Sequence, residues 1–187
     1  MSLYADCSNR RAAETIDGMS DVIQMERSLV EAPRIGESHD FTLRNFQQRE
    51  DIGHWLRIRH AAFAREKLGV RQWDAADFRR EISAKSWWNP ERMWFAEPVI
   101  HAHESPSPIG SVTCALRGSG ADAKPVVHWL AVHPGWRRRG VARLLMSALE
   151  AHCWANGHRT VYLETHADWT AAVAFYETLG YGVATRS

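Results

Sequence analysis

The 187-residue chain has few cysteines and almost no net charge. Its three cysteines, Cys7, Cys114 and Cys153, are odd in number and form no Cys-x-x-Cys pair, so neither a disulfide framework nor a cysteine-rich metal site is indicated. The 23 basic and 22 acidic residues leave a net charge of +1, which provides no general attraction to nucleic acid or to a membrane surface. No apolar run approaches the ~20 residues of a membrane helix, and the first residues lack the apolar core of a signal peptide. We therefore expect a cytoplasmic protein that binds neither nucleic acid nor membranes.

The chain also lacks the two common nucleotide-binding loops, because it contains neither Gly-x-Gly-x-x-Gly nor a glycine followed by Lys-Ser/Thr. It does contain an apolar strand over residues 126–132, a turn through Pro134 and Gly135, and a helix that begins near Gly140. No Ser, Thr, Asp or Asn between Val132 and Gly140 can cap this helix, so its first N–H groups need another partner. Gly140 has no Cβ to block an approaching anion, and three arginines precede it. The pattern predicts a pyrophosphate seat for a different nucleotide cofactor.

Two motifs in this order resemble those of the GNAT superfamily of N-acetyltransferases. The first is Arg137-x-x-Gly140-x-Ala142 after a strand, which is similar to the acyl-CoA signature of that family. The second begins with the strand Val161-Tyr-Leu-Glu-Thr165 and continues in a helix with small, aromatic and glycine residues at the family's spacing, namely Ala172, Tyr176, Leu179, Gly180 and Tyr181. Trp169 departs from the pattern, because the family commonly has Asn there. A polar contact to the cofactor is therefore in question.

The resemblance implies an α/β (α+β) fold with a central mixed sheet of about six strands, four flanking helices and splayed central strands. Residues 40–187 form this domain, and residues 1–39 form an N-terminal extension that is helical or disordered. Hydrophobic spacing indicates strands over 41–46, 91–99, 109–116, 126–132 and 161–165, and helices over 51–65, 74–87, 141–150 and 169–180.

The C-terminal end of the expected sheet is short. The family usually adds a final strand after residues 181–185, and this chain stops at Ser187. Either the sheet has an unusual edge or another segment covers it, since open strand edges tend to be covered. The N-terminal extension could do so, and so could a partner subunit in a homodimer.

The resemblance also implies acetyl-CoA as cosubstrate. The backbone of the strand before the turn then pairs with the pantetheine arm, and the turn and two helices hold the rest of the molecule. The corresponding positions are Leu130, Ala131, Val132, Arg137, Arg138, Arg139, Gly140, Val141, Ala142, Ala172 and Phe175.

Acetyl transfer to an amine needs a proton donor for the leaving thiolate and a base for the ammonium. Tyr176 is the candidate acid, because a phenol with a pKa near ~10 can donate without being ionised at neutral pH; a half-buried packing role is the alternative. His128 is the candidate base, since its strand is similar to that of arylalkylamine N-acetyltransferases, although it could simply donate to a carbonyl. Glu164 on the next strand is the reserve base.

We therefore expect an acetyl-CoA-dependent N-acetyltransferase that acts on a small-molecule or peptide primary amine by direct attack in a ternary complex. The alternatives are a protein or peptide N-terminal acetyltransferase, a non-catalytic acyl-CoA-binding regulator, and a nucleic-acid-binding domain that uses the arginine turn. No metal is expected, because His101-x-His103 lies in a Pro- and Ser-rich loop without a third ligand. Four tryptophans are candidates for an acceptor pocket, namely Trp87, Trp88, Trp94 and Trp129.

Overall fold

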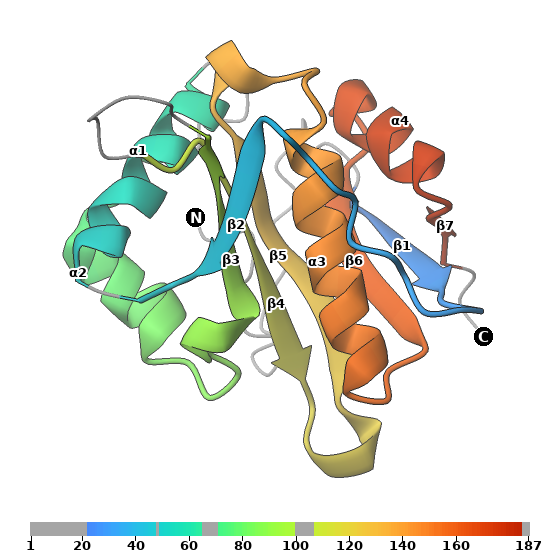
Figure 1. Cartoon of the computed structure of the whole chain (residues 1–187). Coiled ribbons are helices and arrows are strands. Elements are labelled where there is room, and N and C mark those ends of the chain that lie inside the picture. The colour runs from blue at the N-terminus through green and yellow to red at the C-terminus, as the bar shows by residue number, and fades with distance from the viewer. Residues whose placement is uncertain (1–21, 48, 65–70, 100–106, 185–187) are drawn as a thin grey trace.

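The computed structural model describes residues 22–47, 49–64, 71–99 and 107–184. Its centre is a seven-stranded mixed sheet in the order β2-β3-β4-β5-β6-β1-β7 (Figure 1). β5 and β6 are parallel, and the other neighbouring strands are antiparallel. The strands are β1 (Val22–Ser28), β2 (Phe41–Asn45), β3 (Met93–Pro98), β4 (Gly110–Arg117), β5 (Lys124–Val132), β6 (Thr160–His166) and β7 (Gly182–Val183).

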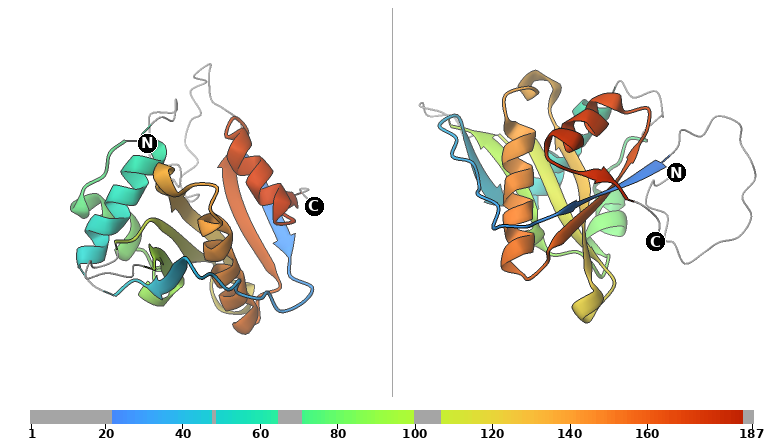
Figure 2. Two further views of the ribbon diagram at one scale, coloured as in Figure 1. Left: turned by 45° about the horizontal axis from the view of Figure 1, so that its top comes forward. Right: turned by 90° about the vertical axis from the view of Figure 1, so that its right-hand side faces the viewer.

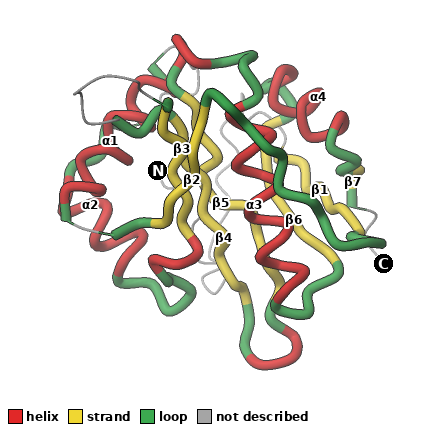
Figure 3. The backbone as a smooth tube through the Cα atoms, viewed as in Figure 1, coloured by secondary structure: helices red, strands yellow, loops and turns green. Residues whose placement is uncertain are grey.

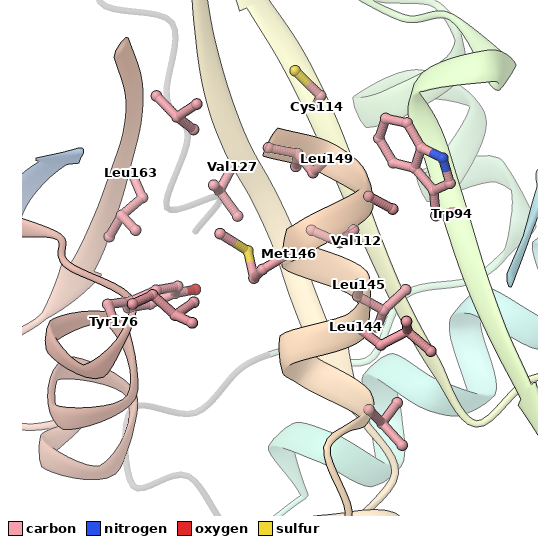
Figure 4. Close-up of a cluster of buried hydrophobic side chains, with 14 of the residues drawn as sticks. Trp94, Val112, Cys114, Val127, Leu144, Leu145, Met146, Leu149, Leu163 and Tyr176 are labelled. Carbon is pink, nitrogen blue, oxygen red and sulfur yellow. The ribbon is translucent and has the colours of Figure 1, made fainter. Parts of the chain in front are cut away.

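Helices cover both faces of this sheet (Figures 1 and 2). α3 (Val141–Ala155) and α4 (Thr170–Thr178) lie on one face, and α1 (Glu50–Phe63) and α2 (Ala75–Phe78) lie on the other. Each face has its own apolar core. The α3/α4 core contains Leu145, Leu149 and Leu163 (Figure 4), and the α1/α2 core contains Trp55 and Phe78. Short 3₁₀ turns occur at Pro90–Arg92, Gly120–Asp122 and Pro134–Trp136.

The second helix is shorter than the expected span of residues 74–87. It begins with a capping box, in which the Asp74 side chain accepts from the amide of Asp77 and the Asp77 side chain accepts from that of Asp74. After Phe78 the chain continues as a π-helical turn, Arg79–Ser83, and the Ala84 amide closes that turn on the Arg79 carbonyl at 2.8 Å. The regular helix ends at this turn. Residues 84–87 follow it outside the helix, and the Trp87 ring packs against His128 of β5.

The strand β1 differs most from the sequence expectation. It pairs with β6 over seven residues, from Val22↔His166 to Ser28↔Thr160, and with β7 at Met25↔Val183. The expectation of helix or disorder is therefore wrong for residues 22–28; residues 1–21 lie outside the described ranges. Of the two segments considered for completing the sheet, the N-terminal extension is the one that does so, and it raises the strand number to seven.

Side chains on one face of β1 hold it in place. Met25 is buried, and the guanidinium of Arg27 donates from Nη1 to Glu150 Oε2 of α3 at 2.7 Å. The hydroxyl of Tyr181 donates to the other oxygen of Glu150 at 3.0 Å. From Leu29 the chain crosses over α3 to reach β2 on the far side of the sheet (Figure 3). The N-terminal strand is thus tied to the core of the domain.

The sheet opens in the middle, as expected for splayed central strands. β5 and β6 share one paired position, Val126↔Tyr162, and separate beyond it. β5 also contains a bulge, because its register with β4 shifts between Thr113↔His128 and Ser111↔Ala131. Trp129 lies in the bulge with a φ of 53°. A bulge of this kind redirects the strand and its side chains.

Candidate active site

The start of α3 has the features of an anion seat. Gly140 is the N-cap with a φ of 86°, and no side chain caps the helix. The first intrahelical bond runs from the Leu144 amide to the Gly140 carbonyl at 3.0 Å, so the amides of Val141, Ala142 and Arg143 have no partner one turn earlier. A Cβ placed on Gly140 would meet no atom within 4 Å, which leaves the space in front of these amides open. The helix dipole favours negative charge at this position.

The arginines of the turn have different surroundings. Arg137 donates from Nη2 to the Ala62 carbonyl at 2.6 Å and from Nε to the Val132 carbonyl at 3.3 Å, so its guanidinium ties the turn to the end of α1. The guanidinium of Arg139 lies over the ring of Trp136, 5.0 Å from its centroid. Arg138 is exposed and has a φ of 62°. The structure thus shows that the Arg137 guanidinium fixes the turn, and its expected part in binding the cofactor stays a prediction.

A cavity of about 120 Å³ lies where β5 and β6 separate. Four residues expected at the site line it, namely Leu130, Glu164, Ala172 and Tyr176. The structure adds Val22 from β1, Phe63 from α1, and His166 and Trp169 from the end of β6 and the start of α4. The strand β5 leads from this cavity directly into the turn and the anion seat. Ala131 and Val132 are buried in that strand, and Phe175 packs half-buried against the α3/α4 core.

Tyr176 reaches the cavity from the α4 side of the sheet. Its side chain is 9% exposed and belongs to the α3/α4 core (Figure 4). Its ring packs near those of Phe175 and Tyr181, with centroids 5.5 Å and 5.8 Å away. These contacts fix the ring while it lines the cavity.

Glu164 lines the cavity from β6 and is paired with residues of two other strands, the adjacent β1 and the more distant β4. Arg117 donates to its carboxylate from Nη1 at 3.1 Å and from Nη2 at 3.4 Å, and Gln24 of β1 donates from Nε2 at 3.5 Å. The carboxylate is therefore oriented by β4 and β1 together.

His128 is placed differently from the expectation. It does not line this cavity, and its ring lies 4.8 Å from that of Trp87 beneath the α1/α2 face. Complete burial lowers its pKa to about 3, and Arg117 contributes in the same direction. An imidazole with this pKa is neutral but is a weak base. This placement argues against His128 as the group that takes the amine proton.

One of the four tryptophans expected in an acceptor pocket lines the cavity, namely Trp129. Trp87 packs on His128, Trp88 packs on Phe46, and Trp94 contacts His152. These three rings therefore do not line this cavity, and a role for them in acceptor binding stays a prediction.

His166 and Trp169 are the residues that sequence reasoning missed. Their ring centroids are 5.0 Å apart, and the ring of Trp169 also lies 5.5 Å from that of Phe63. The available signal was strand alternation, because His166 stands two positions after Glu164 and so shares its face of β6. Trp169 was noticed only as a departure from a motif.

Among the described residues, no group of three or more His, Cys, Asp or Glu side chains is arranged to hold a metal ion. His101 and His103 lie outside the described ranges. No helix in the described ranges has both the length and the apolar character needed to cross a membrane.

Comparison with known proteins places this arrangement in a family. The sequence profile of the acetyltransferase (GNAT) family matches residues 45–181. Mycothiol acetyltransferase of Mycobacteroides abscessus is 29% identical over 163 residues, which cover 86% of this chain and 52% of that protein. The [ribosomal protein bS18]-alanine N-acetyltransferase of Salmonella typhimurium is 41% identical over 56 residues, which cover 30% of this chain and 38% of that protein.

A solved structure agrees in fold. The GCN5-related N-acetyltransferase from Sphaerobacter thermophilus superposes with a TM-score of 0.69 at 21% identity, covering 88% of this chain and 49% of that one. The chain spans about half the length of the mycothiol acetyltransferases that it matches. With the profile covering the β2–α4 part of the sheet and both motifs, the chain belongs to the GNAT acetyltransferase family.

Proposed function

We propose that this chain is an acetyl-CoA-dependent N-acetyltransferase that transfers the acetyl group to a primary amine by direct attack in a ternary complex. The observation that carries the proposal is the continuity of the uncapped, Gly140-started helix with the opening between β5 and β6, where Tyr176 lies. The helix start suits a pyrophosphate, and the opening suits the thioester arm. The backbone around Leu130 is available for the arm, because the bulge takes Trp129 and Leu130 out of register with β4.

In this reaction the amine nitrogen forms a bond to the acetyl carbonyl carbon and the carbon–sulfur bond breaks. Tyr176 gives its phenolic proton to the departing thiolate, since its side chain lines the cavity in which the sulfur would lie. Glu164 receives the amine proton, directly or through water, and Arg117 holds its carboxylate in place. His128 is not part of this scheme, because it lies away from the cavity.

The acceptor is a small-molecule amine or a peptide amine. The alanine N-acetyltransferase relative supports the peptide alternative, although its similarity covers 30% of this chain. A non-catalytic acyl-CoA-binding regulator is the alternative from another class. The arginine turn gives little support to nucleic-acid binding, because the guanidinium of Arg137 is engaged by main-chain carbonyls and that of Arg139 lies on Trp136. We also propose a cytoplasmic location, with a homodimer as the candidate oligomeric state.

Two measurements test the proposal. Calorimetry should show acetyl-CoA binding, and a thiol-release assay with a panel of alkylamines, amino-acid amides and short peptides should show turnover. Binding without turnover for the whole panel would favour the regulator, and absence of binding would refute the cofactor seat.

A further inference from the structure

Trp169 carries a polar group that nothing in the described structure satisfies. Its indole Nε1 is buried and has no hydrogen-bond acceptor among the described residues. A buried donor without a partner is costly, and such groups in folded proteins usually mark a place that water or a ligand occupies. Trp169 lines the cavity between β5 and β6, so a ligand bound there lies beside this indole ring.

The ring of Trp169 reaches toward the face of the sheet opposite α3. It stands at the N-cap of α4, without a side-chain capping bond, and its ring packs on Phe63 of α1. Phe63 in turn packs edge-on against Trp129, with centroids 5.6 Å apart. Phe63 and Trp129 both belong to the core on the α1/α2 side. The seat for acetyl-CoA lies at the start of α3, so this aromatic wall borders the side from which the amine enters.

Building on the proposed function, we propose that Trp169 determines acceptor specificity by donating its indole N–H to a carbonyl oxygen next to the reacting amine. The acceptor is then an α-amino acyl compound, such as a peptide N-terminus or an amino-acid amide, in preference to a plain alkylamine. The size of the cavity supports this assignment. A cavity of about 120 Å³ has room for a short polar group beside the amine, such as an α-carbonyl, but not for a long chain between the two.

The thioester carbonyl is the competing oxygen in the same cavity. Leu130 lies in the bulge of β5, out of register with β4, and lines the cavity, so we assign its main chain to that carbonyl. The indole on the opposite wall is left for the acceptor. These two assignments predict different kinetics, because a contact to the thioester serves every amine equally, whereas a contact to the acceptor serves only amines that carry the oxygen.

The kinetic test compares alaninamide with sec-butylamine, which has the same amine and methyl group but no carbonyl. In Trp169→Phe the aromatic wall remains and the N–H is lost. The preference for alaninamide, measured as the ratio of the two kcat/KM values, should fall roughly 2- to 10-fold, as expected for one neutral hydrogen bond. The matched control is Trp154→Phe on α3, whose ring carries the Arg159 guanidinium and does not line the cavity; its preference should equal that of the wild type.

A spectroscopic test uses the wild-type protein labelled with ¹⁵N-tryptophan. The Trp169 indole signal is assigned by its loss in Trp169→Phe, and it should shift downfield when alaninamide is added to the CoA-saturated protein, but not when sec-butylamine is added. An unchanged preference in Trp169→Phe, or an indole shift caused fully by CoA alone, would overturn the assignment while leaving acetyl transfer intact. Absence of turnover with the whole amine panel, with acetyl-CoA bound, would instead refute the proposed function, and the indole shift would then decide this inference alone.

Discussion

The attachment of β1 to α3 can be tested by removing one charge. In Arg27→Met the methionine keeps much of the aliphatic volume, but the Glu150 carboxylate loses the guanidinium that lies 2.7 Å away. Glu150 is 3% exposed, so water replaces the lost partner only in part. The hydroxyl of Tyr181, 3.0 Å away, remains as its hydrogen-bond donor. The variant therefore leaves a buried carboxylate with one neutral partner.

Breaking a buried ion pair on one side costs about 3–5 kcal/mol. The side chain of Arg27 is 31% exposed, so water already screens part of the pair and we expect about 2–4 kcal/mol. For a chain of this size that loss lowers Tm by roughly 5–15 °C. Urea denaturation followed by circular dichroism gives the free energy of unfolding directly.

The loss should depend on pH in a defined direction. Burial raises the pKa of Glu150 above its ordinary value of 4.5, and Arg27 opposes that rise. Without Arg27 the folded-state pKa rises further. A carboxyl of this kind contributes stability that is fully present below about 4.5 and is lost as pH rises through its folded pKa. The destabilisation of Arg27→Met should thus be larger at pH 8 than at pH 4.5.

The double variant Arg27→Met/Glu150→Gln is the control. The amide of Gln keeps an acceptor for Tyr181 and removes the buried charge, so this variant should recover more than half of the loss seen in Arg27→Met. A loss below ~0.5 kcal/mol in Arg27→Met, or one that does not change between pH 4.5 and pH 8, would show that the pair does not hold β1.

Three further predictions concern the site. Gly140→Glu should abolish acetyl-CoA binding in calorimetry, whereas Gly157→Glu, at the other end of α3 with a φ of +85° and equally open surroundings, should bear similar backbone strain and keep the affinity. Tyr176→Phe should lower kcat by up to ~10²–10⁴-fold and should retain the affinity for acetyl-CoA. If this variant turns over as fast as the wild type where chemistry limits the rate, Tyr176 has a packing role only. Because burial lowers the pKa of His128 to about 3, the free energy of unfolding of the wild type should fall as pH falls from 6.5 toward 3, and that of His128→Gln should fall less. Urea denaturation at each pH measures both, and an equal fall in the two proteins would count against this burial effect.

The order of elements from β2 to α4 could be predicted because the signals are local. The apolar spacing of α3 and the motif around Gly140 are properties of neighbouring residues, and the structure agrees with both. The strand β1 gave no such signal. Exposure alternates along β1, with Met25 as its one fully buried side chain, but the residue types do not show it, because Val22 is half exposed and Arg27 lies on the more buried face. Its position is set by pairing with β6 and by Arg27 and Glu150, which are 123 residues apart.

The site residues were also predictable only where a local pattern places them. Tyr176 and Ala172 reach the cavity because helical spacing places them on one side of α4. His128 was chosen as the base because its strand is similar to that of arylalkylamine N-acetyltransferases, but the orientation of side chains near it depends on the bulge at Trp129. A one-residue shift in register changes which face a side chain takes, and no sequence pattern marked this bulge.

The opening between β5 and β6 also bears on how transfer takes place. Tyr176 approaches it from the α3/α4 core, while Phe63 and Trp129 approach it from the α1/α2 core, so the cavity is reached from both faces of the sheet. Two substrates that enter from opposite faces can meet there without an intermediate carrier on the protein. Among the described residues that line the cavity there is no cysteine, and Cys114 and Cys153 are buried together with sulfur atoms 3.8 Å apart. The contact with Cys114 and, after it, burial raise the pKa of Cys153, and a thiol of that kind is a poor nucleophile. This arrangement supports direct attack by the amine, because the sheet itself brings the two reactants to one place.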